Sequence, residues 1–245
     1  MIYFCLLPHL ASIINIHAIG SPMQNRHIAI WLTGIACVAF LMQNIIPGFT
    51  GSITLVSAFV WQRPWTLLTS IFAHANIVHI LFNGYALALF GSILEEKVGT
   101  FRFITVFLLA GLASGFASTF FYGAVLGASG AIFGILGALA VLEPFMTVFV
   151  YYIPLPMFVA AFIWAALDAL GFVTGVQAGG LGNVANAGHI AGLATGILAG
   201  LILRGKKPVN IGFWGLGRKK NSFMTAEEFD KWEKENMSAD EQAKR

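Results

Sequence analysis

Charge is almost absent from most of this chain of 245 residues, and this absence limits what the chain can fold into. From Arg204 onward lie 10 of the 14 Lys and Arg residues and 7 of the 11 Asp and Glu residues. Only 10% of all residues are charged, whereas soluble domains carry about a quarter. With a mean hydropathy of +0.79, the composition predicts a polytopic membrane protein with a solvated tail.

The apolar stretches are bounded by Pro, Gly or charged residues, and a membrane span needs about 20 residues. The fourth stretch is short for a full crossing, so its helix is expected to start below the membrane surface. Pro154 and Pro156 disfavour a helix through 145–156, which is interpreted as an extended interfacial piece. The glycine-rich stretch 171–188 is expected to be a mobile loop. We predict an all-α bundle of six transmembrane helices, at about 28–46, 67–94, 103–123, 128–142, 157–172 and 186–203.

Two segments flank this predicted membrane domain, which covers residues 23–204. Residues 1–22 are apolar but broken by Pro8, and they lack the initial positive charge of a signal peptide. We interpret them as an extension that precedes a start at Met23. In the tail, 205–245, a capping-box pattern begins at Thr225 and predicts a short amphipathic helix. A fully solvated tail fits the same residues equally well.

The positions of Lys and Arg predict how the bundle is oriented. With six spans, only Arg63 falls on the side opposite the other basic residues near the spans, so the positive-inside rule places both termini in the cytoplasm of a cell-membrane protein. Because the basic residues flank spans and do not alternate with aromatics on one face, nucleic-acid binding is not expected. The shared side carries Arg26, Lys97, Arg102, Arg204, Lys206 and Lys207.

A serine between glycines opens the fourth apolar stretch. Ser129, in Gly127-Ala128-Ser129-Gly130, is predicted to begin a helix, where free backbone N–H groups and a partial positive charge favour an oxyanion. Taken alone, such a serine is more often a packing residue at a contact between membrane helices. A distant histidine, His189, shifts this balance toward chemistry, because ionisable side chains within spans are rare and usually functional.

Two glycine stripes predict that Ser129 and His189 meet. Gly188, Gly192, Gly196 and Gly200 recur every fourth residue on one helix face, and Gly130, Gly134 and Gly137 form a second bare face. Close packing of these faces would bring the serine within hydrogen-bond reach of the histidine, as general-base activation requires. Asp168 is expected near a helix end and facing water, so we predict a Ser–His dyad without a third carboxylate.

A second polar cluster lies in the second apolar stretch. His79 and Asn83 are four residues apart, on one helix face, and can donate hydrogen bonds to one developing negative charge; a satisfied polar pair in the core is the alternative. His74 is five residues before His79, off that face. This spacing does not match the familiar helical zinc pair, so no metal site is expected.

These motifs, in this order and spacing, resemble those of the rhomboid intramembrane serine proteases over most of 28–203. The resemblance implies that Ser129 in its Gly-x-Ser-Gly motif is the nucleophile and His189 the base. It also implies an oxyanion hole made by His79, Asn83 and the Ser129 backbone N–H. The resemblance assigns supporting places to His74, Gly127, Gly130, Gly192, Gly196, Glu95 at the end of the second span, and Arg63, whose Trp61-Gln62-Arg63 differs from the family pattern by one inserted residue.

The resemblance further implies a serine endopeptidase without cofactors. Its substrates would be single transmembrane segments of other proteins, entering sideways from the lipid bilayer past the second and fifth spans. They would be cut near their outer ends, at a site in the outer half of the membrane. Two alternatives are an inactive rhomboid-like protein that only binds membrane segments, and a transporter or proton channel that uses the histidines as relays. Retention of both Ser129 and His189 argues against the first, and the lack of an inverted repeat of broken spans against the second.

Overall fold

The computed structural model describes residues 28–150, 152–174 and 185–206. The extension 1–22, the tail helix expected after Thr225 and residues 175–184 of the glycine-rich loop lie outside these ranges, so those predictions stay predictions. Helices make up most of the described chain, as the apolar runs predict. They are α1 (Ile28–Ile45), α2 (Phe49–Ile53), η3 (Ser57–Phe59), α3 (Thr66–Thr69), η4 (Ser70–Phe72), α4 (Ile77–Ala86), η5 (Leu87–Gly91), α5 (Ser92–Val98), α6 (Thr100–Ser118), α7 (Ser129–Leu142), α8 (Met157–Thr174) and α9 (Asn186–Leu203).

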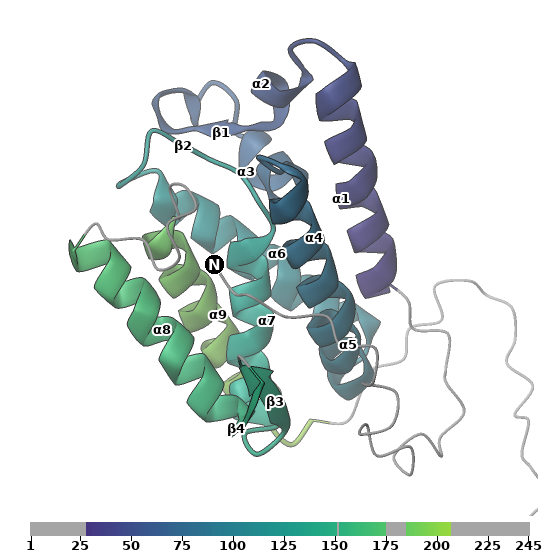
Figure 1. The fold of residues 1–245 in the computed structure, drawn as a ribbon, viewed down its shortest axis with the longest axis vertical. Coiled ribbons are helices and arrows are strands. Elements are labelled where there is room, and N and C mark those ends of the chain that lie inside the picture. The colour runs from purple at the N-terminus through teal and green to yellow at the C-terminus, as the bar shows by residue number, and fades with distance from the viewer. Residues whose placement is uncertain (1–27, 151, 175–184, 207–245) are drawn as a thin grey trace, which may run out of the picture. The chain divides into compact units, whose positions relative to one another are not determined.

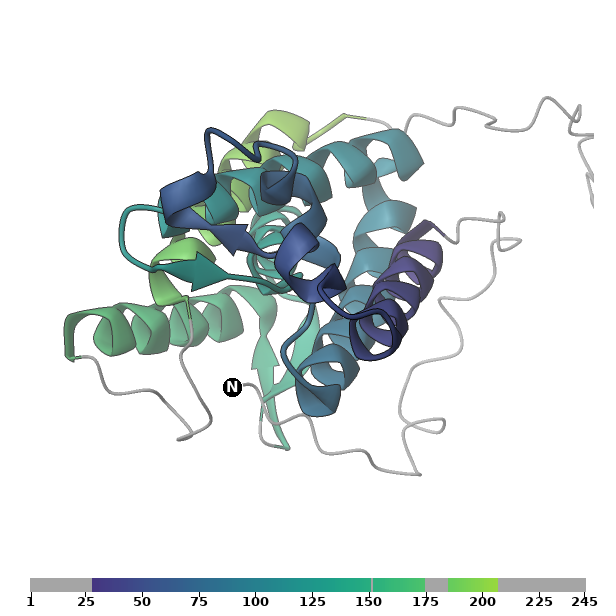
Figure 2. The same ribbon diagram turned by 90° about the horizontal axis from the view of Figure 1, so that it is seen from above.

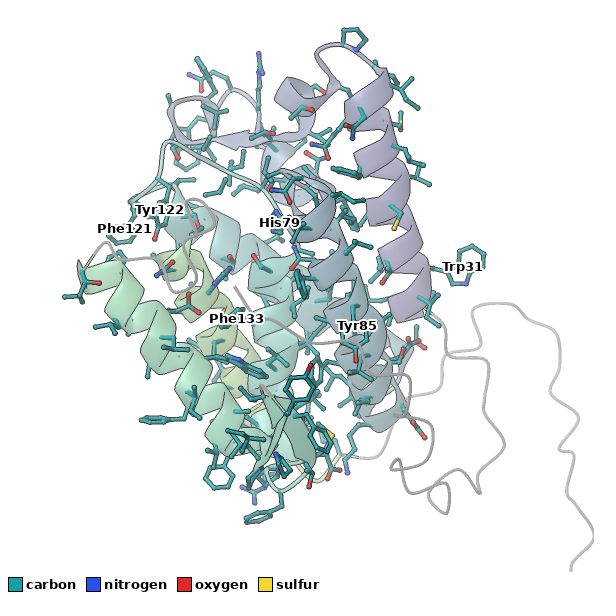
Figure 3. All side chains as sticks on the ribbon, viewed as in Figure 1. Trp31, His79, Tyr85, Phe121, Tyr122 and Phe133 are labelled. Carbon is teal, nitrogen blue, oxygen red and sulfur yellow. The ribbon has the colours of Figure 1, made fainter. Side chains whose placement is uncertain are left out.

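Five of the described helical segments are long and apolar enough to cross a membrane: α1, the continuous α4–η5–α5 segment Ile77–Val98, α6, α8 and α9. Many of their large apolar side chains point away from the bundle, as Figure 3 shows for Trp31, which is 69% exposed. In a bilayer these faces contact acyl chains, whereas in water they would form patches too large for a monomer. The helix α7 is apolar but has only 14 residues.

The short helix α7 lies at the centre of the bundle. Every residue from Gly130 to Leu139 is buried, and Figures 1 and 2 show α7 enclosed by α4, α6, α8 and α9. At 1.5 Å per residue it is about 21 Å long, less than the hydrocarbon core of about 30 Å. The short fourth helix expected from the sequence is therefore present, and Ser129 is its first residue.

The second span begins ten residues later than predicted. Residues 67–72 belong to the short helices α3 and η4, an extended stretch follows, and α4 starts only at Ile77. The reason is a side-chain cap: Asn76 has extended backbone angles, and its Oδ1 accepts a hydrogen bond from the backbone N–H of His79 at 2.9 Å. Hydropathy did not show this boundary, because residues on both sides of it are apolar.

Two helix ends also differ from those predicted, and so does the length of the loop after α8. The third helix, α6, ends at Ser118 and not near residue 123. The fifth helix, α8, continues to Thr174, so the expected loop 171–188 is shorter than predicted. Glu95, near the end of the second span, is fully buried, and its carboxylate accepts hydrogen bonds from the Ala29 N–H at 3.1 Å and the Thr100 hydroxyl at 2.7 Å. It therefore ties the start of α1 to the turn between α5 and α6.

Two short antiparallel strand pairs complete the described fold. β1 (Leu55–Val56) pairs with β2 (Ala124–Val125), with Leu55 opposite Val125, and this places the chain just before Ser129 against the first loop. β3 (Thr147–Val150) pairs with β4 (Ile153–Pro156) in a hairpin. The segment expected to be extended because of its prolines is therefore extended.

Candidate active site

Ser129 is the first residue of α7, and the loop before it is held in place by its backbone. Gly127 donates a backbone hydrogen bond to the carbonyl oxygen of Ser70 at 2.8 Å and has φ +123°, which L side chains rarely adopt. A Cβ atom at Gly127 would also lie 2.9 Å from Nε2 of His79. Glycine is thus required here both by the backbone angle and by the close approach of the histidine.

His189, the fourth residue of α9, lies directly against Ser129. Its Nε2 is 2.8 Å from the serine Oγ, within the range of a good hydrogen bond. The glycine stripes allow this approach, because Cβ atoms at Gly192 and Gly196 would come closer than 2.5 Å to the carbonyl oxygens of Gly130 and Gly134. The predicted packing of the two bare faces is therefore present in the structure.

The imidazole of His189 is also held by an aromatic ring. Phe133, one turn after Ser129 on α7, stacks on it with ring centroids 4.3 Å apart and an interplanar angle of 10°. Figure 3 labels Phe133 on α7, between α8 and α4. This stacking fixes the plane of the histidine ring.

The prediction that no carboxylate contacts His189 is wrong. Asp168, on α8, places its Oδ1 3.1 Å from Nδ1 of His189, and the two side chains are only 11% and 12% exposed. Asp168 therefore points into the bundle and not toward water. The sequence missed this contact because the two residues are 21 positions apart, and apolar residues surround the aspartate on all sides of its helix.

His79 and Asn83 reach the same loop from α4, across from His189. Nδ1 of His79 accepts a hydrogen bond from the Ala75 N–H at 3.5 Å, so the neutral ring carries its proton on Nε2, the atom beside Gly127. Nδ2 of Asn83 is buried and has no hydrogen-bond partner among the described residues; a Cβ at Gly127 would lie 3.6 Å from it. Two N–H donors thus point toward the start of α7, and Figure 3 shows His79 on this inner face.

His74 lies in the extended stretch before α4 and not on the helix itself. It is 2% exposed, and its ring packs edge-on against that of His79, with centroids 5.0 Å apart. The side-chain amide of Gln43, on α1, holds its backbone by accepting from the His74 N–H at 2.9 Å and donating to its carbonyl oxygen at 3.2 Å. His74 therefore supports His79, and the sequence analysis missed the contribution of Gln43.

A small pocket opens beside Ser129, on the side of α6. Three further serines, Ser70, Ser114 and Ser118, line it together with glycines and His189. Hydroxyl groups at this depth suit water molecules, which need several polar partners in a buried site. In the described ranges, no three His, Cys, Asp or Glu residues gather where they could hold a metal ion.

Arg63 belongs to a different part of the molecule. Its guanidinium lies 5.7 Å from the ring centroid of Phe59, and Nη1 is 3.5 Å from the carbonyl oxygen of Gly51. These contacts all lie within the first loop. The supporting role expected for Arg63 stays a prediction.

Similarity to known proteins identifies the family of this chain. Residues 61–206 match the model of the Rhomboid domain, which is more than half of the chain. The chain belongs to the rhomboid family. It is 36% identical over 177 residues to the rhomboid protease GluP of Bacillus subtilis, which is 67% of this chain and 32% of GluP. It is 33% identical over 142 residues to RHOMBOID-like protein 1 of Arabidopsis thaliana, covering 56% of this chain and 34% of that relative.

The chain thus spans about a third of the length of these two relatives. It covers 92% of the rhomboid protease GlpG of Haemophilus influenzae, with 24% identity over 185 residues and 73% of this chain. Family membership and the apolar helices together make this a multi-pass membrane protein with a rhomboid-type helical bundle. The fold class predicted from the sequence is therefore confirmed.

Proposed function

We propose that the protein is an intramembrane serine endopeptidase in which Ser129 is the nucleophile and His189 the general base. The observation that carries this proposal is the 2.8 Å separation between the serine Oγ and the histidine Nε2. A serine hydroxyl is a weak nucleophile until an adjacent base can accept its proton. An unprotonated Nε2 at this distance supplies that base.

The reaction would proceed in two halves. As Oγ attacks the scissile carbonyl carbon, its proton passes to Nε2 of His189, which then protonates the leaving amine as an acyl-enzyme forms. A water molecule, deprotonated by the same nitrogen, then attacks the acyl carbon; the imidazolium returns that proton to Oγ as the ester C–O bond breaks, which releases the acid product and Ser129. The polar pocket beside the serine is a suitable place for that water.

The oxyanion formed in each half needs hydrogen-bond donors already in place. Nε2 of His79, Nδ2 of Asn83 and the backbone N–H of Ser129 are our candidates. In support, the first two border the Gly127 loop, and the Asn83 amide nitrogen has no partner among the described residues that would compete with an oxyanion. A buried donor without a partner costs free energy unless a ligand or transition state uses it.

We infer that the substrates are single transmembrane segments of other proteins. A site at the start of a short central helix lies below the membrane surface, so a bond near the outer end of a substrate span could reach it. Lateral entry from the bilayer, between α4 and α8, fits the positions of these helices on either side of α7 in Figure 1. The substrate must unwind locally there, since a helix hides its peptide bonds.

We infer a cell-membrane location with both termini in the cytoplasm. The ends of α5 and α9 and the start of α6 lie at one end of the bundle, away from the start of α7 (Figure 1). These ends carry Lys97, Arg102, Arg204 and Lys206, the basic excess typical of the cytoplasmic side. Lys97 also forms an ion pair with Glu143 at the end of α7.

The direct test is cleavage of a reporter transmembrane segment by the purified full chain in proteoliposomes. Ser129→Ala and His189→Ala should each abolish cleavage while the protein stays inserted and folded. Ser52→Ala, which removes an exposed hydroxyl in α2, should cleave at the wild-type rate. Full cleavage by either site variant would reject the dyad, and a wild-type protein that binds the segment without cutting it would favour an inactive family member.

A further inference from the structure

The carboxylate of Asp168 is the one charged group in contact with the candidate base within the described residues. Its Oδ1 lies 3.1 Å from Nδ1 of His189, on the side of the ring opposite Ser129. The backbone of Asp168 is fixed as well, since the buried Asn186 side chain donates to its carbonyl oxygen at 3.1 Å. This contact joins α8 to the start of α9, three residues before the histidine.

A carboxylate in a membrane-spanning helix needs a physical reason. Asp168 is 9% exposed, and its carboxylate forms a hydrogen bond with the His189 ring. Burying such a group costs several kcal/mol unless a partner compensates, and ionisable residues within spans are rare and usually functional. The position of Asp168 is better explained by its effect on the histidine than by stability.

That effect concerns which ring nitrogen carries the proton. Stacking on Phe133 fixes the plane of the His189 ring. A half-turn about the Cβ–Cγ bond would keep that plane and exchange the two edges of the imidazole, so stacking by itself does not fix where the ring nitrogens lie. A carboxylate only accepts hydrogen bonds, so it holds the proton on Nδ1 and leaves Nε2 free to accept the proton of Ser129. It also stabilises the imidazolium formed after the transfer.

We propose that Asp168 is a positioning residue that acts through His189, so that the serine, histidine and aspartate work as a three-membered relay of hydrogen bonds. This inference rests on the proposed function of the same site. No proton has to move onto the carboxylate: the serine proton passes to Nε2, and the Nδ1 proton stays between the ring and Oδ1.

The test combines kinetics with a measurement on the histidine itself. In Asp168→Asn the amide can donate to Nδ1 and so favours the wrong tautomer, and in Asp168→Ala the acceptor is lost. With a reporter transmembrane segment in proteoliposomes, both variants should lower kcat about tenfold or more and leave KM within about twofold. Glu96→Gln makes the same carboxyl-to-amide exchange at an exposed site on α5 and should match the wild type.

Nitrogen NMR of the full chain labelled in histidine gives the second readout. The wild type should show His189 protonated on Nδ1, and both Asp168 variants should show a larger fraction protonated on Nε2. A purely structural aspartate would change the melting temperature but neither kcat in the folded fraction nor the tautomer. Wild-type kcat in both variants, or an unchanged tautomer, would overturn the proposal. If the wild type itself does not cleave, the proposed function fails, and the tautomer still decides whether Asp168 sets the state of His189.

Discussion

Gly192→Ala tests whether the close approach of α7 and α9 is what aligns the site. The added Cβ would come closer than 2.5 Å to the carbonyl oxygen of Gly130, whereas ordinary contact begins at 3.4 Å. Because the obstacle is backbone, the two helices must separate by about 1 Å. His189 is three residues away, so the shift would stretch its 2.8 Å bond to Ser129 beyond the hydrogen-bond limit of about 3.2 Å.

The size of the effect follows from this displacement. Overpacking of this kind costs about 1–3 kcal/mol of stability, and a misplacement of about 1 Å at a reacting centre can cost about a hundredfold in rate. Thermal unfolding in detergent and kcat on a reporter segment measure the two effects separately. Gly34→Ala is the matched control, because a Cβ on Gly34 in α1 meets no atom within 4 Å. A Gly192→Ala protein with wild-type stability and kcat would refute the reasoning.

Three further predictions concern other parts of the site and its support. Asn83→Ala should lower kcat about tenfold or more with little change in KM or melting temperature, because its amide nitrogen has no partner among the described residues to lose; an unchanged kcat would remove it from the oxyanion hole. Glu95→Gln should cost about 1–3 kcal/mol in unfolding measurements, since the buried carboxylate accepts hydrogen bonds from Ala29 and Thr100; an unchanged melting temperature would contradict this. Burial, and to a lesser extent the neighbouring histidine, lowers the pKa of His74 from 6.5 to about 4, so the unfolded chain binds more protons between these values. Stability should therefore fall as the pH drops from about 6.5 toward 4, and less steeply in His74→Gln; equal slopes in melting temperature against pH would show that His74 is not the group responsible.

The sequence predicted the elements whose boundaries are marked by Pro, Gly or charge. Pro47 and Gly48 follow α1, Glu143 and Pro144 follow α7, and the observed helices end there. The meeting of Ser129 with His189 was also predictable, because two glycine stripes leave few other ways to pack α7 against α9. These signals are local in the chain or repeat along one helix face.

The rest depended on contacts between distant segments. The start of α4 is set by the Asn76 cap within an apolar region, where hydropathy changes little. Asp168 reaches His189 only because α8 turns that face inward, and no apolar periodicity marks the face. The burial of Glu95 was likewise not predictable, because its partner Ala29 is 66 residues away on α1.

The central claim is that His189 activates Ser129 as a nucleophile. A fluorophosphonate probe, followed by mass spectrometry of the labelled full chain, measures this directly, because the probe reacts with an activated serine. We predict one adduct on Ser129 in the wild-type protein and none in His189→Ala. An adduct on another serine, or equal labelling of Ser129 without the histidine, would contradict the account.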